Sequence, residues 1–327
     1  MYTLGIETSC DETSVAVVKD GKKILSNEVS SSLKFHRKYG GVIPEIASRL
    51  QLETIAPVAG LALKNAGVNL RDIGLISVTC GPGLLGSLLV GISFAKAASL
   101  ALGIPLLGVN HVHSHIYAAF LNEKGVKLPF VALVVSGGHT SLFYIRDFDK
   151  IEILGQTLDD ACGEAFDKVA KILKLGYPGG PLIEKLAKSG DGKKIRFGCS
   201  DTQNAFDFSF SGIKTAVLYA ARGRGKSRPD KKDIAASFQE AVIDVLIKKS
   251  LLACKFKKVN RLVVGGGVTA NNRLRDKFIK ASRDAEVYSY FPPKELCTDN
   301  AAMIAGFGFQ LFKRGAASNL DLTAEPN

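Results

Sequence analysis

Residues 2–30 read YTLGIETSCDETSVAVVKDGKKILSNEVS and contain three short segments of alternating apolar residues. These segments, 2–8, 13–19 and 22–30, are rich in β-branched side chains and are separated by polar turns of hairpin length. Alternation with a period of two is typical of half-buried strands. The chain is therefore expected to begin with three antiparallel strands.

A helical period follows the three strands. It begins at Pro44, a favoured first position of a helix, and ends at Gly67. The next segments predict a strand at 73–79, a helix at 84–102, a strand at 104–109 and a helix from Asn110. The order of the first unit is thus βββαβαβα.

The second half repeats this order. We expect strands at 130–136, 140–146 and 150–155, a helix at 159–173, a strand at 259–264, a helix from 271, a strand at 286–291 and a helix from 299. An insertion at about 174–257 holds helices at 211–221 and from 233. The duplication predicts a two-lobed α/β fold with a central cleft, where ligands bind beyond the ends of open sheets. The first lobe is expected at 1–125, with a helix at 300–327 packing back on it, and the second at 126–299.

Composition excludes several classes of protein. The chain of 327 residues is 46% hydrophobic and 23% charged, which is incompatible with a disordered chain. Its six cysteines include no C-x-x-C pair, a pattern typical of reduced thiols. The N-terminal residues lack the features of a signal peptide, and Ser87, Ser93, Lys96 and Ser99 interrupt the apolar stretch 84–107. We expect a cytoplasmic protein that does not enter a membrane.

Lysine and arginine exceed acidic residues, so the formal net charge is +12. Six basic residues fall within 222–232, and Lys255, Lys257, Lys258 and Arg261 follow later. A run of this kind either forms a solvated surface or contacts a phosphate backbone without reading sequence. The count alone leaves both interpretations open.

The segment NHVHSH, residues 110–115, carries a possible metal site. His111 and His115 lie one helical turn apart on one face, a spacing that can bind one divalent metal or serve a pair of structural histidines. Asp299 occupies the matching place in the second repeat. If the two units face each other across the cleft, two histidines and one carboxylate would meet there and leave coordination sites open.

Two enzyme classes are disfavoured by missing residues. In the H-E-x-x-H pattern of zinc proteases the general base follows the first histidine, but here that residue is Val112. The segment GPGLLG, residues 81–86, matches the dinucleotide-binding glycine pattern, yet no acidic residue occurs between Asp72 and Glu123. Close packing of a helix on a sheet explains these glycines equally well.

Three turns could contact a ligand. Gly137 and Gly138 allow backbone N–H groups to approach an anion, although an ordinary hairpin turn would look the same. The turn at 7–13 carries Asp11 and Glu12, which suit a cation or a water molecule better than a phosphate. The three glycines at 265–267 permit close approach of a base or ribose, while Asn271 could contact a ligand or simply cap a helix.

Taken together, these motifs resemble the TsaD family. The similarity rests on GIETSCDET at 5–13, the His111/His115 pair, VSGGHT at 135–140, DFSFSGIKT at 207–215 and GGGVTAN at 265–271, and extends over residues 3–308. This family, formerly described as a sialoglycoprotease, supplies the catalytic subunit that makes threonylcarbamoyladenosine in tRNA. The resemblance implies the two-lobed fold of actin, sugar kinases and Hsp70, in agreement with the duplicated unit.

The resemblance also implies a reaction and its site. The threonylcarbamoyl group would move from threonylcarbamoyl-adenylate to the N6 amine of adenine 37, next to the anticodon, in tRNAs that read codons beginning with A, and AMP would leave. His111, His115 and Asp299 match the family's ligands for a divalent metal, Fe²⁺ or Zn²⁺. The residues that match its nucleotide and substrate contacts, where Mg²⁺ could accompany ATP, AMP or the adenylate, are Val134, Val135, Ser136, Gly137, Gly138, Asp167, Gly180, Glu184 and Asn271.

Other assignments remain open at this point. By chemical type alone, Asp11, Glu12 and His139 are candidates for the group that accepts the proton of the attacking amine. An ATP-dependent small-molecule kinase of the same fold and a nucleotide-binding scaffold subunit are the alternative functions. The resemblance implies tRNA as a partner, and for a bacterial member also the paralogue TsaB and the ATPase TsaE.

Overall fold

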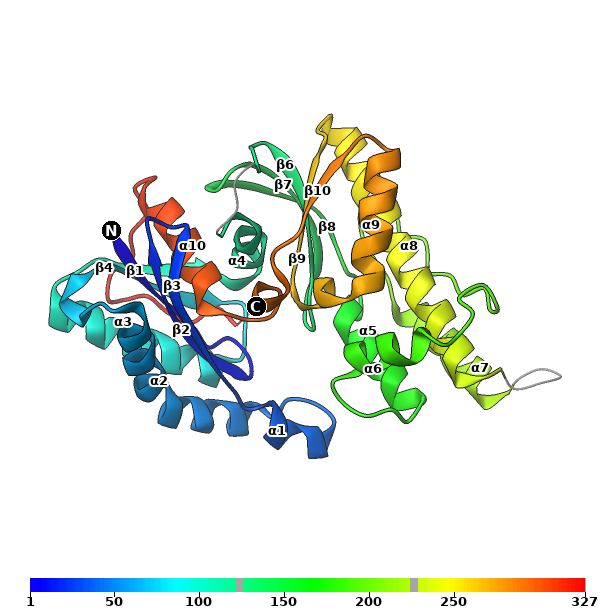
Figure 1. Cartoon of the computed structure of the whole chain (residues 1–327), viewed down its shortest axis with the longest axis horizontal. Coiled ribbons are helices and arrows are strands. Elements are labelled where there is room, and N and C mark those ends of the chain that lie inside the picture. The colour runs from blue at the N-terminus through cyan, green and yellow to red at the C-terminus, as the bar shows by residue number, and fades with distance from the viewer. Residues whose placement is uncertain (122–125, 224–228, 327) are drawn as a thin grey trace. The chain divides into compact units, whose positions relative to one another are not determined.

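The computed structural model describes residues 1–121, 126–223 and 229–326. The chain divides into two compact units, the first formed by Met1–Val126 with Glu295–Asn327 and the second by Lys127–Lys294. Each unit has a five-stranded mixed sheet with helices packed on it (Figure 1). The predicted α/β class and its duplicated strand and helix order are confirmed.

The first sheet has the strand order β3-β2-β1-β4-β5. Its strands are β1 (Tyr2–Glu7), β2 (Glu12–Lys19), β3 (Lys23–Ser31), β4 (Ile73–Gly81) and β5 (Leu106–Asn110). The pairs β1–β2 and β2–β3 are antiparallel, whereas β4 runs parallel to β1 and β5 runs parallel to β4. The antiparallel start predicted from residues 2–30 is therefore confirmed.

Helices cover both faces of this sheet. Leu4 and Ile6 of β1 pack with α2 (Pro44–Ala66) and α3 (Leu85–Leu102) in one apolar core. Gly5 points to the opposite face, where a Cβ atom would meet the carbonyl oxygen of Ala301 at 2.2 Å in α10. The remaining helices of this unit are α1 (Leu33–His36), η1 (Arg37–Tyr39), η2 (Leu70–Asp72), α4 (His111–Tyr117), η3 (Ala118–Phe120) and α10 (Ala301–Phe312), and η5 (Lys294–Leu296) begins at the boundary with the second unit.

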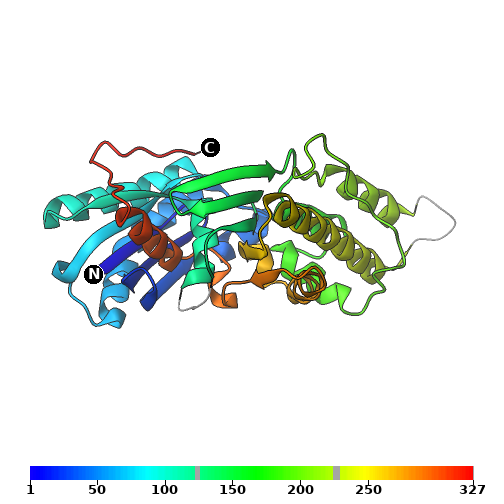
Figure 2. The same ribbon diagram turned by 90° about the horizontal axis from the view of Figure 1, so that it is seen from above.

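The C-terminal helix is shorter than predicted. The expectation of a helix over 300–327 is wrong beyond Phe312, because Gly315 adopts a left-handed φ of 88° and the N–H of Ala316 bonds to the carbonyl of Leu311. This pattern is a Schellman end, which stops a helix. The following tail is extended, and Figure 2 shows it running back over the first unit, where Ser318 N–H bonds to the carbonyl of Leu106.

The second sheet has the strand order β10-β9-β6-β7-β8. Its strands are β6 (Phe130–Val135), β7 (Thr140–Asp147), β8 (Lys150–Gln156), β9 (Arg261–Gly265) and β10 (Tyr288–Tyr290). The strands β6, β7 and β8 form an antiparallel meander, and β9 runs parallel to β6. Because parallel strands end at the same edge of a sheet, the turns after β6 and β9 lie side by side.

Helices of the second unit share one core with the sheet. They are α5 (Cys162–Ile172), α6 (Gly179–Ala187), α7 (Ser211–Arg222), α8 (Lys231–Lys257), η4 (Gly267–Ala270) and α9 (Asn272–Asp284). Val131, Leu133 and Val135, alternate residues of β6, belong to this core. The predicted insertion is confirmed as α6, α7 and α8, placed between α5 and β9.

One helix among the described residues, α3, is long and apolar enough to cross a bilayer by length and composition alone. One third of its 18-residue window is buried, and it packs against α2 and β4. A single helix of this kind is weak evidence for a membrane span, because core helices pass the same test.

Candidate functional site

Two buried histidines lie at the beginning of α4, directly after β5. Asn110 caps this helix by accepting a hydrogen bond from the N–H of His113, which fixes the direction of the first turn. His111 and His115 are 5% and 1% exposed, and their ring centroids are 4.7 Å apart. The predicted placement of both imidazoles on one helix face is confirmed.

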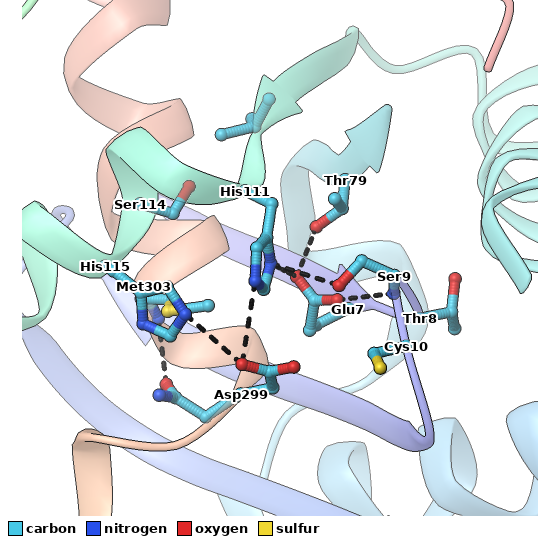
Figure 3. Close-up of polar contacts among 12 residues, drawn as sticks. Glu7, Thr8, Ser9, Cys10, Thr79, His111, Ser114, His115, Asp299 and Met303 are labelled. Atoms are coloured by element: carbon cyan, nitrogen blue, oxygen red, sulfur yellow. Dashed lines mark hydrogen bonds and ion pairs between the residues drawn. The ribbon is translucent and has the colours of Figure 1, made fainter. Parts of the chain in front are cut away.

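Asp299 completes a cluster with these histidines. Its Oδ1 lies 3.2 Å from Nε2 of His115 and 3.6 Å from Nε2 of His111 (Figure 3). One ligand atom from each residue can be chosen so that all three lie within 4.8 Å of one another. Two imidazoles and one carboxylate form a donor set that suits divalent transition metals.

The route by which Asp299 reaches the histidines differs from the expectation. We expected it to come from the second lobe, but Glu295–Asn327 belongs to the first unit, so the whole cluster lies in that unit. The cause is the close docking of α10 on the sheet, where glycine permits contact at Gly5 and at Gly308, whose Cβ would meet Oγ of Ser77 at 2.1 Å. The helix start, and Asp299 just before it, are thereby held beside α4.

The hydrogen bonding of His115 fits a bound metal. Among the described residues, neither ring nitrogen of His115 has a hydrogen-bond partner, although the ring is buried. An unsatisfied buried polar group costs about 1–3 kcal/mol, so such groups are uncommon in folded proteins. The lone pair of Nε2 is therefore available to a ligand near Asp299.

Glu7 is a functional candidate that the sequence reasoning missed. It ends β1 on the same face as Gly5, and its Oε2 lies 2.9 Å from Nδ1 of His111. Oγ of Ser9 is 3.1 Å from the same nitrogen. The available signal was an acidic residue at an inward position of an otherwise apolar strand, since buried carboxylates are nearly always paired.

The charges of this cluster depend on one another. Burial opposes the imidazolium form, but the carboxylates of Glu7 and Asp299 together raise the pKa of His111 to about 9. Burial alone would raise the pKa of Glu7, yet the charge of His111 and the hydrogen bond to it hold that pKa below its usual value. Each group of the pair Glu7–His111 thus favours the charged form of the other.

Asp11 and Glu12 lie in the same unit as the cluster. Burial, followed by the charges of Asp299 and Asp11, raises the pKa of Glu12 to about 10. The carboxyl group of Glu12 therefore keeps its proton at neutral pH and is a poor proton acceptor in this state. The third candidate, His139, lies in the second unit, where its backbone N–H donates to Oγ of Ser136.

The turn after β6 presents open backbone. A Cβ atom at Gly137 or at Gly138 would have no other atom within 4 Å. Val134 and Val135 are fully buried, so their side chains face the interior and only backbone groups remain for a ligand. The next turn packs directly against this one, because Gly266, with a φ of 94°, would bring a Cβ within 2.4 Å of the carbonyl oxygen of Val135.

The other residues matched to nucleotide contacts have structural partners. Oδ1 of Asp167 accepts a hydrogen bond from Gly179 N–H, Oε1 of Glu184 accepts one from Asn272 N–H, and Asn271 caps α9. Gly180, by contrast, would have no atom within 4 Å of a Cβ. A cavity of about 710 Å³ is lined by Glu184, Gln239 and Asn272, among others.

The glycines at 81–86 serve close packing, but against the C-terminal tail, Ser9 and Ser48 of α2 rather than between a helix and the sheet, as the alternative to a dinucleotide site had it. A Cβ at Gly81 would meet the carbonyl oxygen of Glu325 at 1.9 Å, and one at Gly83 would meet Ser9. The N–H of Gly83 also bonds to the carbonyl of Pro326. The C-terminal tail therefore packs directly on this glycine turn.

The fold and the His–His–Asp cluster define an α/β protein of the actin-like class with a potential metal centre. A known example of the fold is HypF of T. kodakarensis, whose structure matches with a TM-score of 0.68 at 16% identity, covering 98% of this chain and 49% of that one. This likeness concerns the fold alone.

Sequence comparison gives the family. Residues 23–306 match the model of TsaD, tRNA N6-adenosine threonylcarbamoyltransferase. Proteins of that name from Thermosipho africanus and Syntrophus aciditrophicus are 53% and 50% identical, covering 100% and 99% of this chain and 99% and 96% of theirs. The chain belongs to the TsaD family.

Proposed function

We propose that this chain transfers the threonylcarbamoyl group of threonylcarbamoyl-adenylate to the N6 amine of the adenine beside the anticodon, at position 37, of tRNAs that read codons beginning with A. AMP is the leaving group. The observation that carries this proposal is the cluster of the buried His111 and His115 with the partly exposed Asp299, in a chain that is about half identical to transferases of this name over its whole length.

His111, His115 and Asp299 would hold one divalent metal, Fe²⁺ or Zn²⁺. The unsatisfied ring nitrogens of His115 support this assignment, because a metal would use a lone pair that is otherwise left without a partner. When bound, such an ion supplies Lewis-acid polarisation of a carbonyl group. The three side chains leave further coordination positions open to substrate.

The second unit would bind the nucleotide part of the substrate, with or without Mg²⁺. The open backbone at Gly137 and Gly138 can donate N–H groups to a phosphate. Gly180 offers a second stretch of open backbone, and the cavity beside Glu184 can accept a base or ribose. Because Asn271 caps α9, its contribution would be to hold the turn after η4 in place.

Orientation would account for much of the rate, because the exocyclic amine of adenine is a weak nucleophile and needs a near-attack geometry. Of the three candidates for the proton acceptor, Glu12 is disfavoured by its raised pKa. Asp11 and His139 remain, and substitution of each would show which affects the pH dependence of transfer.

A basic groove on the second unit would contact the tRNA backbone. A cavity of about 760 Å³ is lined by four cationic side chains, Lys248, Lys255, Lys258 and Arg261, and by one acidic side chain, Glu286. Lys257 is engaged elsewhere, since its Nζ lies 2.7 Å from Oε1 of Glu152. Residues 224–228 of the basic loop 222–232 lie outside the described residues.

Transfer of label tests the function directly. The full chain is incubated with labelled threonylcarbamoyl-adenylate and unmodified tRNA, with and without TsaB and TsaE, which we propose as partners. Label should reach tRNA with the native chain and be lost with His115→Ala, which removes one proposed ligand and its contact with Asp299. His113→Gln, a change on the same helix outside the cluster, should stay active.

Metal content separates the alternatives. The transferase should bind about one transition metal ion per chain, whereas a kinase of this fold relies on Mg²⁺ and phosphate contacts, and a scaffold needs no metal. Transfer at the native rate by metal-stripped protein or by His115→Ala would overturn the metal assignment. Phosphorylation of a small molecule without transfer to tRNA would favour the kinase.

The groove predicts a salt effect. Lys248→Gln with Lys255→Gln should weaken tRNA binding about equally for all tRNA sequences and reduce the salt slope by about 1–2. Lys23→Gln with Lys64→Gln, which removes two exposed positive charges from the other unit, serves as the matched control. An unchanged slope in the double variant would show that the groove is solvated surface only.

A further inference from the structure

Glu7 is a fully buried carboxylate that none of the preceding assignments uses. It is 1% exposed and ends β1 on the face covered by α10. Val78 of β4 lies beside Ile6 of the parallel strand β1, so the next residue, Thr79, is adjacent to Glu7. The sheet register therefore fixes this carboxylate between Thr79 and the start of α4.

Each oxygen of Glu7 accepts hydrogen bonds. Oε1 accepts from the N–H of Ser9 at 2.5 Å, and Oε2 accepts from Oγ1 of Thr79 at 2.6 Å (Figure 3). Oε2 also lies 2.9 Å from Nδ1 of His111. Because a carboxylate can only accept, Nδ1 of His111 must be the donor in this contact.

The two ring nitrogens of His111 therefore have different roles. Nδ1 carries a proton directed at Glu7, and Nε2 lies 3.6 Å from Oδ1 of Asp299. We propose that Glu7 is a positioning residue that keeps the proton on Nδ1 of His111 and so turns the lone pair of Nε2 toward Asp299 and His115. This inference rests on the proposed metal site, and it assigns to Glu7 a function distinct from that of the three ligands.

The asymmetry within the pair supports the assignment. His115, the other imidazole, has Oδ1 of Asp299 3.2 Å from Nε2, but among the described residues no group hydrogen-bonds to its Nδ1 and fixes its tautomer. His111 is held by Glu7 and, at 3.1 Å, by Oγ of Ser9. Groups that hydrogen-bond to a metal-binding histidine fix its tautomer and ring orientation, and their loss commonly weakens metal affinity by about 10–100-fold.

Stability alone is a weaker explanation for Glu7. A buried ion pair often contributes little net stability, since the cost of removing both charges from water offsets their attraction. An apolar side chain at the end of β1 would fill the same space without that cost. The carboxylate has one consequence that an apolar residue cannot reproduce, namely a defined tautomer at His111.

Glutamine at position 7 would not be a conservative replacement. If its oxygen keeps the 2.5 Å bond from Ser9 N–H, its amide NH₂ faces Nδ1 of His111. Nδ1 would then have to accept, and the remaining proton would move to Nε2, where it blocks the lone pair. If the amide is turned the other way, its NH₂ group faces the backbone N–H of Ser9, so that two donors oppose each other. Either arrangement weakens the site.

The test measures Zn²⁺ affinity of the full chain by competition with a chromophoric chelator, and the visible absorption of the Co²⁺ form. Glu7→Gln should lower Zn²⁺ affinity by about 10–100-fold and alter the Co²⁺ bands. Thr79→Val and Ser9→Ala, which each remove one hydrogen bond of this network and leave the carboxylate, should change affinity by less than about threefold.

Glu7→Asp provides a second variant if Glu7→Gln does not fold, because it keeps the charge but draws the carboxylate away from Nδ1. Native affinity in every folded Glu7 variant would overturn the positioning role. His115→Ala distinguishes the two proposals: if it binds Zn²⁺ as tightly as the native chain, the metal assignment itself fails. In the Zn²⁺-loaded native protein, imidazole ¹⁵N NMR should find the His111 proton on Nδ1, and a proton on Nε2 would contradict the inference.

Discussion

At the scale of single residues, glycines near the turn after β6 differ in the space around them. Gly137 and Gly138 are open, whereas Gly163 is crowded. A Cβ at Gly138 would meet no atom within 4 Å, but a Cβ at Gly163 would lie 2.6 Å from the carbonyl oxygen of Ser136. The first pair leaves room for a ligand, and the second lets α5 approach the turn. Gly137 and Gly138 therefore fit the proposed binding role, whereas Gly163 has a packing role.

This contrast predicts opposite effects of adding side chains. Gly138→Val should change the free energy of unfolding by less than about 0.5 kcal/mol, because nothing crowds the new atoms. It should nevertheless weaken AMP binding by about tenfold, equal to about 1.4 kcal/mol, by blocking access to the backbone. Calorimetric titration with AMP and urea unfolding measure the two effects.

Gly163→Ala is the control for the effect on stability. It should lower the free energy of unfolding by about 1–3 kcal/mol, because the added methyl group overpacks the contact with the turn. Native AMP affinity in folded Gly138→Val would show that the turn is an ordinary hairpin.

Residue types and spacing predicted the cluster members but not the group behind them. His111 and His115 share a helical face, and the repeat supplied Asp299, so all three were found from sequence order. Glu7 was missed because its contact with His111 joins residues 104 positions apart and depends on the register of β1 beside β4. The register follows from packing of the whole sheet, which local periodicity does not describe.

At the scale of elements, two neighbouring carboxylates join the insertion to the rest of the second unit. Oδ1 of Asp159 accepts from the N–H of Phe210, just before α7. Asp160 lies between two lysines, 2.5 Å from Nζ of Lys168 and 2.8 Å from Nζ of Lys214. The motif at 207–215 thus has a structural basis, because it docks α7 onto the segment that precedes α5.

This arrangement predicts a pH dependence of stability. Burial would raise the pKa of Asp160, but hydrogen bonds and charges from Lys168 and Lys214 hold it below the ordinary value of 3.8. Since the folded pKa is depressed, the contribution is complete above pH 3.8 and disappears as the pH falls through the folded pKa. Asp160→Asn should therefore cost about 1 kcal/mol or less at pH 7.

Urea unfolding at a series of pH values measures this difference, which should shrink below pH 4, near the ordinary pKa of 3.8. Asp284→Asn is the control, because Asp284 forms no ion pair within the part of the chain that the structure describes. A difference between Asp160→Asn and the native chain that persists unchanged into acid would contradict the role of the lysines.

Element order was more predictable than element ends. The strands of both sheets follow from alternation, whereas the C-terminal helix stops at Phe312 because Gly315 takes a left-handed φ and the tail finds partners on β4 and β5. Those partners are more than 200 residues away in sequence. A local sequence pattern cannot show whether a helix continues to the C-terminus or ends early and is followed by a tail that a distant strand holds.

At the scale of the whole molecule, the two units differ in which segments of the chain form them. The second unit, Lys127–Lys294, is one continuous segment, whereas the first unit needs both ends of the chain. Without the segment Glu295–Asn327, β1 would lose α10, the helix that covers Gly5, and the cluster would lose Asp299. The three proposed metal ligands therefore come together only when the N-terminal and C-terminal segments are both folded.

This difference predicts how fragments behave. The segment Lys127–Lys294 contains its own apolar core and its own sheet, so it should unfold cooperatively when produced alone, as expected for a domain of this size. It should bind no stoichiometric Zn²⁺, because all three ligands lie in the other unit. A fragment of residues 1–294 should unfold the second unit cooperatively while its first 126 residues remain protease-sensitive. Adding a peptide of residues 295–327 in trans should restore both protease resistance of the first 126 residues and Zn²⁺ binding. If the fragment 1–294 resists protease without the peptide, the N-terminal sheet is stable by itself and the C-terminal segment contributes only the ligand.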